Sequence, residues 1–342
     1  MTRRRFVRWT AVLLLAVVLM GLGWGWTKVH PKVGQPFELP SDDGGKLWSF
    51  GFVGDTHEGR GITNRIFEKL GEAKLEFVMH LGDLVDRGES DPQWEYVMGQ
   101  AVRNRLRIMP VVGNHDKERS YDDEGEIRFR QYFPHLPRTY YHFRHRGVNF
   151  IVLNSEYVPS PGSTQARFLK WQLEQHPGTT VVCIHRPVFT CSERDSANMY
   201  LSRLWVHGGL QGSDAVMVLT GHNHYYERTK PLDGITYVVS GGGARNLYPP
   251  EPPNEFTEVF KARKNHYGLV DVYADHMHVR ILDLADNQID SFRVPLKPTD
   301  LDPGTLGNRS SRELPPLATL PQYQPDRLAL RPGFPNQLPR PW

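Results

Sequence analysis

Five short polar clusters, each directly after an apolar run, constrain this chain more than any other feature of its sequence. An apolar run of about five residues rich in Val, Ile and Phe predicts a buried β-strand. The clusters consist mostly of Gly, Asp, Asn and His, which turn the chain and offer nitrogen and oxygen ligands. Because open α/β sheets carry their sites at strand ends, we expect all five on one rim of one sheet. The clusters are Gly54-Asp55-Thr56-His57, Gly82 to Gly88, Gly113-Asn114-His115-Asp116, His185-Arg186-Pro187 and Gly221-His222-Asn223-His224.

Between and after the clusters, the hydrophobic pattern alternates between helical and strand periods. This alternation predicts an α/β fold with crossover helices. The last three strands lie beyond the final cluster, and we expect them to form a second sheet. Helices are expected at 63–73, 92–105, 164–175 and 199–207, with a loop and short helix at 117–138; further strands are expected at 140–146, 148–154, 235–240, 267–274, 278–283 and 289–294.

The first 30 residues differ from the rest of the chain. An Arg-rich start precedes a stretch without charge from Trp9 to Trp26, a pattern typical of an export signal or membrane anchor. As a helix, the stretch spans roughly 27 Å, marginally enough to cross the hydrocarbon core of a membrane. The start also resembles a twin-arginine export signal. We therefore expect an extracytoplasmic, periplasmic protein anchored in the inner membrane by residues 9–26, or alternatively one that is cleaved and exported.

The remaining organisation follows from composition. Residues 31–46 form a polar linker, residues 47–297 one catalytic domain, and residues 298–342 a Pro-rich tail that is extended or disordered. A net charge of +3 in 342 residues indicates no nucleic-acid-binding stripe. Two cysteines are too few for a disulfide scaffold or a zinc–thiolate site. Cys183 and Cys191 either pair with each other or remain separate thiols.

In their order and spacing, the five clusters resemble the calcineurin-like metallophosphoesterase family. Its motifs read GDxH, GDxxD, GNHD or GNHE, a single His after a strand, and GHxH. The resemblance implies two packed mixed β-sheets flanked by helices, a four-layer α/β/β/α sandwich. The run from Gly221 to Arg228 is similar to the Gly-His-x-His-x-Tyr-Glu-Arg run of the purple acid phosphatases. Within the family, the chain therefore resembles purple acid phosphatase-like bacterial members, over about residues 47–295.

One departure from the purple enzymes concerns their metal-ligating tyrosine. Asp86 stands at the position of that tyrosine, and the first cluster contains His57, which those enzymes lack. The resemblance thus implies that His57 replaces the tyrosine as ligand. No tyrosinate-to-iron colour is then expected, and a pair of divalent ions (Mn, Fe or Zn) is favoured.

The family pattern also implies a role for each residue of the clusters. A water or hydroxide that bridges two divalent metal ions is the nucleophile, and His115 protonates the leaving oxygen or stabilises the transition state. Asp86 or Asp116 orients His115, and Arg87 binds phosphate or, alternatively, forms a structural salt bridge. His207 is an alternative to His185 as ligand. The implied ligands are Asp55, His57, Asp83 and His224 for one ion, and Asp83, Asn114, His185 and His222 for the other.

The function implied is metal-dependent hydrolysis of phosphate esters, with a phosphomonoesterase favoured. A phosphodiesterase or a pyrophosphohydrolase acting on nucleotides or lipid-linked substrates remains an alternative. A catalytically silent binding protein is a more remote one. The expected partners are a phosphorylated small-molecule or lipid substrate and, through the N-terminal segment, a membrane; no nucleic acid is expected.

Overall fold

The computed structural model describes residues 28, 30–35, 45–57, 59–117, 126–157, 162–193 and 196–296. The predicted membrane segment at 9–26 and the predicted tail at 298–342 lie outside these residues. Within the described part of the chain, no helix is both long enough and apolar enough to span a membrane.

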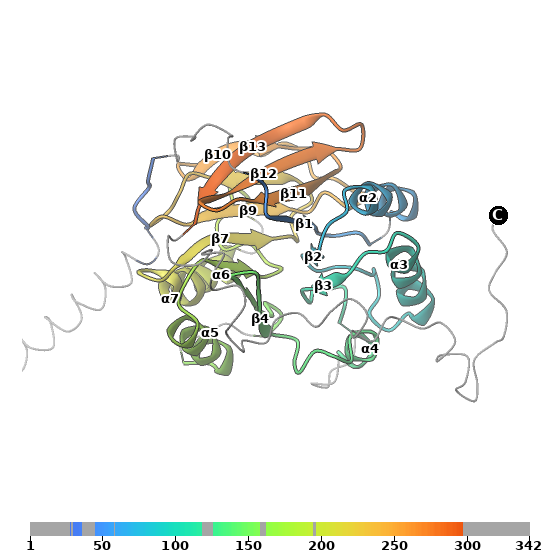
Figure 1. Ribbon diagram of the computed structural model, residues 1–342, viewed down its shortest axis with the longest axis horizontal. Helices are drawn as coiled ribbons and strands as arrows, with labels where there is room; N and C mark the ends of the chain where they lie inside the picture. Colours follow the sequence, from blue (N-terminus) through green and yellow to red (C-terminus); the bar gives the residue numbers. More distant parts are fainter. Residues whose placement is uncertain are drawn as a thin grey trace, which may run out of the picture.

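Two mixed β-sheets pack face to face in the centre of the molecule (Figure 1). The first contains, in order, β13 (Gln288–Pro295), β12 (His276–Asp283), β11 (His266–Val272), β1 (Trp48–Val53), β2 (Val78–His80) and β3 (Ile108–Pro110). The second contains β10 (Thr257–Lys261), β8 (Tyr226–Thr229), β9 (Thr236–Ser240), β7 (Ala215–Thr220), β6 (Thr180–Cys183), β5 (Val148–Val152) and β4 (Tyr141–His145).

Aromatic side chains from both sheets fill the space between them. The ring centroids of Phe50 in β1 and Phe150 in β5 lie 5.3 Å apart, edge to face. Phe77 lies 5.4 Å from Phe50 and 5.2 Å from Phe150. Such rings bury a large apolar area and add favourable contacts between their edges and faces. The sheets are therefore held together mainly by hydrophobic packing.

Helices cover the two outer faces of this pair of sheets. On the first sheet lie α2 (Arg60–Glu72), α3 (Asp91–Arg103) and α4 (Ile127–Tyr132), which share a buried apolar cluster with it. On the second lie α5 (Thr164–Gln175), α6 (Ser196–Ser202), the π-helical turn η1 (Arg203–His207) and α7 (Gly208–Leu210). The arrangement confirms the predicted four-layer α/β/β/α sandwich.

Two expectations about the sheets were wrong. The five clusters do not follow strands of one sheet, because β1, β2 and β3 belong to the first sheet and β6 and β7 to the second. The last three strands do not form a second sheet either. They extend the first sheet, because β11 pairs antiparallel with β1 at its free edge. The clusters therefore meet at a junction between two sheets.

The element bounds agree with expectation for α5, which spans the expected residues 164–175, and less well elsewhere. Helix α2 begins at Arg60 rather than at residue 63, and the helix expected at 199–207 is α6 followed by η1 and α7. Strands β8 and β10 were not expected. Strand β10 is an edge strand whose residues are all at least partly exposed, so it lacks the apolar alternation that marks a strand.

Candidate metal centre

Backbone hydrogen bonds join the cluster loops across the junction between the sheets. In the first sheet, the N–H of Asp55 donates to the carbonyl of Gly82 at 2.9 Å. In the second, the N–H of Gly221 donates to the carbonyl of His185, also at 2.9 Å. The N–H of Gly54 crosses to the carbonyl of Ser240 at 3.0 Å. These bonds join the first loop to the second and the fourth to the fifth, and the N–H of His115 in the third loop donates to Asp83 Oδ1 in the second at 2.8 Å.

Three of the predicted ligands have left-handed backbone conformations. The φ angles are 63° at Asp55, 55° at Asp83 and 67° at His222. Non-glycine residues seldom adopt such angles, and where they do the surrounding structure must hold them. At Gly113, an added Cβ would overlap the carboxylate of Asp83, so only glycine allows this close approach. Strained backbone angles therefore set the direction of these side chains.

The structure brings imidazole and carboxylate side chains of the clusters into three overlapping groups that could hold a metal ion. Within each group, one ligand atom of every residue lies within 4.8 Å of the others. His57 and Asp83 each belong to two groups, so the groups form one continuous centre. The groups are Asp55, His57 and His224; His57, Asp83 and His115; and Asp83, His185 and His222.

Two histidines have their tautomers set by backbone carbonyls. His185 donates from Nδ1 to the carbonyl of Leu81 at 2.8 Å, and His224 donates from Nδ1 to the carbonyl of Asn246 at 2.7 Å. In the neutral imidazole, Nε2 then carries the lone pair and is free to ligate. His185 Nε2 lies 3.3 Å from Asp83 Oδ2 and 3.2 Å from Asn114 Oδ1. A lone pair facing two oxygens is unfavourable unless a proton or a metal ion lies between them.

The charge balance of these groups leads to the same conclusion. Burial opposes a charge on His185, but the nearby Asp83 carboxylate outweighs it and raises the pKa of His185 to about 10. Burial likewise opposes a charge on Asp83, but His185 and His57 hold the pKa of Asp83 below its usual range. The pocket therefore binds a positive charge, carried by a proton or by a metal ion.

His57 and His224 also fit a metal. Their Nε2 atoms face each other at 3.4 Å, and His224 Nε2 lies 3.6 Å from Asp55 Oδ1. His57 Nδ1 is buried and makes no hydrogen bond to any described residue. A set of Asp, Asn and imidazole donors suits divalent ions such as Mn, Fe and Zn. The residues present therefore fit the divalent metal ions that the sequence predicts.

His115 lies at the mouth of this centre. Its side chain is partly exposed, and its ring stacks on that of His57 with 4.5 Å between the centroids. Its Nδ1 lies 3.0 Å from the backbone carbonyl of Asp86 and 3.5 Å from Asp86 Oδ1. Of the two carboxylates considered as its orienting partner, Asp86 is the one beside it.

Asp116 has other partners. Its buried carboxylate accepts N–H bonds from Asp83 at 2.8 Å, Leu84 at 2.7 Å, Val85 at 3.2 Å and Gly113 at 2.9 Å. Burial and the neighbouring Asp83 carboxylate raise the pKa of Asp116 to about 8, and the backbone N–H bonds oppose this shift only in part. Asp116 therefore joins the loop after β2 to the loop after β3 rather than facing His115.

Arg87 is exposed beside the centre. Its backbone N–H and that of Asp86 donate to the side-chain oxygen of Gln93 at 3.0 and 2.9 Å, which fixes the turn they share. Its guanidinium forms no ion pair with the part of the chain that the structure describes. The geometry thus gives no support to the structural salt bridge considered above.

Two further alternatives are also decided. His207 lies 2.7 Å from the hydroxyl of Tyr237 and 3.1 Å from Asp233 Oδ2, in a buried group apart from the centre. It is therefore not an alternative to His185.

Cys183 and Cys191 are both free thiols.

Sequence reasoning missed two side chains at the centre. Arg186 donates to both carboxylate oxygens of Glu156, at 2.9 and 3.1 Å, and to His222 Nε2 at 3.1 Å. Its place directly after His185 was the available signal. Tyr248 stacks on His224 with 4.5 Å between the ring centroids, and no motif marks it. Both residues fix the orientation of a ligand histidine.

This combination of fold and loops is that of a metallophosphoesterase, and comparison with known proteins gives the family. The family model for calcineurin-like phosphoesterases matches residues 49–226, slightly more than half of the chain. The chain belongs to the calcineurin-like phosphoesterase family.

Two curated plant proteins resemble the chain in sequence. A phosphoenolpyruvate phosphatase of Allium cepa is 25% identical over 224 residues, which are 59% of this chain and 45% of that protein. Purple acid phosphatase 21 of Arabidopsis thaliana is 25% identical over 229 residues, 57% of this chain and 52% of that protein. The chain thus spans about half the length of these relatives, and they confirm the predicted relationship to the purple acid phosphatases.

The structure also resembles a solved purple acid phosphatase. For PPD1 from yellow lupin seeds, the TM-score is 0.62 at 18% identity, with 72% of this chain and 53% of that one covered. At this identity the likeness shows the shared fold.

Proposed function

We propose that this chain hydrolyses phosphate esters, preferably monoesters, at a centre that holds two divalent metal ions. The observation that carries the proposal is the buried carboxylate of Asp83, which belongs to two ligand groups at once. A shared carboxylate is what a pair of adjacent metals requires. The residues that would hold the ions are Asp55, His57, Asp83 and His224 for one, and Asp83, Asn114, His185 and His222 for the other.

When bound, two such ions supply Lewis acidity and lower the pKa of a water that can attack phosphorus. His115 stands at the mouth of the centre and gives a proton to the leaving oxygen. The backbone carbonyl of Asp86, 3.0 Å from His115 Nδ1, holds the proton on that nitrogen and turns Nε2 outward. The Asp86 carboxylate lies 3.5 Å from the same nitrogen and helps to orient the ring.

Arg87 is the candidate for holding the phosphate oxygens. Its exposed guanidinium carries no ion pair to the described residues and is next in sequence to Asp86. A planar guanidinium can donate two parallel hydrogen bonds to a phosphate. Its exposure lets it reach a substrate at the mouth of the centre.

The preference for monoesters is supported by the relatives, since both curated proteins are named as phosphatases. The test is hydrolysis of p-nitrophenyl phosphate and bis-p-nitrophenyl phosphate by the metal-loaded chain, with and without a chelator. We expect faster turnover of the monoester, abolished by chelation. Faster turnover of the diester would favour a phosphodiesterase, and no turnover with metal bound would favour a silent binding protein.

From its sequence pattern alone, we propose that the N-terminal segment anchors the chain in the inner membrane with the catalytic domain on the periplasmic side. Fractionation of expressing cells tests this. We expect the protein in the membrane fraction, released by detergent and not by high salt. Recovery in the soluble periplasmic fraction would instead favour cleavage and export, and recovery in the cytoplasm would contradict both.

A further inference from the structure

We propose that the preferred substrates are phosphate monoesters whose organic part carries a second anionic group. This inference rests on the proposed function and concerns the substrate class of the same site. It comes from a basic cavity that adjoins the metal centre. Hydrolysis there would add water across the P–O ester bond, releasing inorganic phosphate and an alcohol that keeps the second anion.

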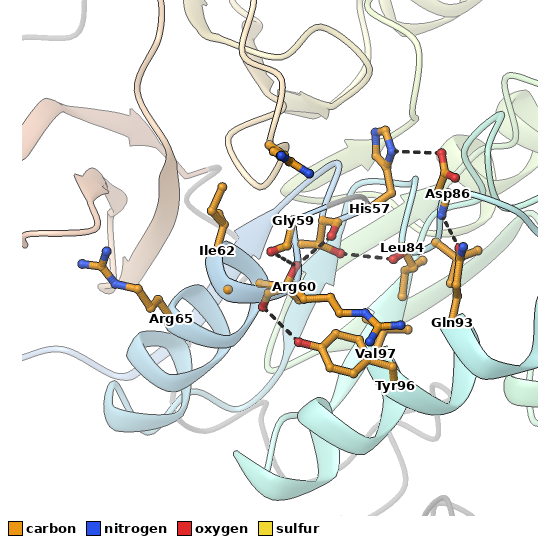
Figure 2. Close-up of a pocket in the computed structure, with 15 residues that line it drawn as sticks. His57, Gly59, Arg60, Ile62, Arg65, Leu84, Asp86, Gln93, Tyr96 and Val97 are labelled. Atoms are coloured by element: carbon orange, nitrogen blue, oxygen red, sulfur yellow. Dashed lines mark hydrogen bonds and ion pairs between the residues drawn. The ribbon is translucent and has the colours of Figure 1, made fainter. Parts of the chain in front are cut away.

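The cavity has a volume of about 700 Å³ and opens beside the ligands. His57 and Asp86 form part of its wall, and both residues contact His115 at the metal centre. Figure 2 shows His57 and Asp86 facing each other on one side and the first turns of α2 on the other. The cavity is thus an extension of the centre toward α2 and α3.

Positive charge dominates the lining. Arg60, Arg65 and Arg245 line the cavity, and Asp86 is the one carboxylate among the lining residues. Arg65 is engaged elsewhere, since it donates to the carbonyl of Leu284 at 3.1 Å and points away from His57 in Figure 2. Arg60 and Arg245 therefore supply the charge that faces the cavity.

An aromatic ring holds the guanidinium of Arg60 in position, and no described carboxylate neutralises its charge. It lies over the ring of Tyr96, 4.8 Å from the centroid, and extends across this ring toward Gln93 (Figure 2). The Tyr96 hydroxyl donates to Asn64 Oδ1 at 2.5 Å, which fixes the ring. Neither Arg60 nor Arg245 forms an ion pair with a carboxylate in the described ranges. Preorganised, unpaired guanidinium groups are the groups that bind carboxylate or phosphate well.

Apolar side chains complete the lining. Ile62, Leu84, Val85 and Val97 contribute aliphatic side chains to the wall. Pockets of this size accept small molecules, with apolar walls and a few polar groups that fix their orientation. The fitting ligand is therefore a small organic phosphate with its anions at opposite ends of a short carbon skeleton.

The test uses alkyl phosphates that differ in a single group. Butyl phosphate, 4-phosphooxybutanoate and butane-1,4-diyl bisphosphate share one carbon chain and end in a methyl, a carboxylate and a phosphate. We expect the metal-loaded full chain to show a kcat/KM roughly ten-fold or more higher for at least one of the two esters with a second anionic group than for butyl phosphate, as two charged hydrogen bonds allow. Comparing these two esters tells carboxylate from phosphate as the preferred second group.

Charge-neutral variants assign the effect to the cavity. In Arg60→Gln and Arg245→Gln, the ratio of kcat/KM for the preferred ester with a second anionic group over that for butyl phosphate should fall several-fold toward one. In Arg167→Gln, which removes an exposed arginine from α5, the wild-type ratio should persist. Equal kcat/KM values for all three esters, or an unchanged ratio in both cavity variants, would overturn this inference while leaving the hydrolase in place. Absence of turnover for every ester would overturn the proposed function itself.

Discussion

The role of a side chain at this centre depends more on its surroundings than on its residue type. His115 and His57 have stacked rings, yet His57 is buried among ligands and His115 is partly exposed. The motif alone marks both as polar residues after strands. Burial and partners separate a ligand from a residue available for proton transfer.

His115→Ala should therefore lower kcat for p-nitrophenyl phosphate by roughly 10²–10⁴-fold, the usual contribution of general acid catalysis. Elemental analysis of the same sample should show unchanged metal content. Since His115 also falls in one ligand group with His57 and Asp83, loss of metal would show that it is a ligand instead. His176→Ala, which removes an imidazole at the end of α5, is the control and should keep both metal and activity.

The sequence predicted the residues that gather here but not all their roles. The resemblance to the family motifs assigned the ligands, and the structure brings the Asp and His side chains among them together; that they bind metal stays a prediction. The function of Asp116 was not predictable, because its partners are backbone N–H groups of a loop about thirty residues earlier in the chain. The arginines of the cavity were not predictable either, since no spacing distinguishes Arg60 or Arg245 from solvated surface residues.

Strands and their loops position these residues. The loops after β2 and β3 are held together by one side chain. Asp116 connects them through four hydrogen bonds to backbone N–H groups. An amide at this position can accept with its oxygen only, so N–H groups facing its nitrogen would be left buried without an acceptor. Each such loss costs about 1–3 kcal/mol.

Asp116→Asn should accordingly lower the free energy of unfolding of the metal-free chain by roughly 2–4 kcal/mol, measured in urea. Asp91→Asn, which breaks a partly exposed ion pair with Arg128, is the matched control and should cost less than about 1 kcal/mol. If Asp116→Asn unfolds like the wild type but loses turnover with metal retained, Asp116 acts in the reaction and the structural role is wrong.

The order of most strands and helices along the chain was predictable from the sequence. The sheet to which each strand belongs was not. Apolar runs reveal that a strand is buried, whereas the pairing partner depends on contacts distant in sequence. Strand β11 pairs with β1 across most of the domain. The short strand β8 was not predicted, because it follows the fifth cluster closely and its sequence resembles a continuation of that loop.

The described part of the molecule is two packed sheets covered by helices, and it buries histidines whose pKa is lowered. Burial lowers the pKa of His207 and of His266 to about 4, although Asp233 beside His207 opposes the shift there. In the unfolded chain a histidine titrates near pH 6.5. Between these values the unfolded chain binds more protons than the folded one, so stability should fall as the pH falls from about 6.5 to about 4.

Each such histidine should contribute a slope of roughly 1.4 kcal/mol per pH unit to the free energy of unfolding in this range. Urea unfolding of the chelated protein at several pH values measures the slope. His207→Gln should be less sensitive to acid than the wild type by about one histidine's contribution. Identical slopes for the two proteins would show that His207 is already protonated in the folded state.

The central claim is that Asp83 is shared by two metal ions that act together in phosphate ester hydrolysis. It is tested most directly by elemental analysis and p-nitrophenyl phosphate turnover on one sample, during stepwise reloading of the chelated chain with Mn²⁺ or Zn²⁺. We predict that turnover reaches its maximum at two ions per chain, and that Asp83→Asn retains at most one ion and loses turnover. Full activity with a single ion, or two ions bound without turnover, would contradict the account.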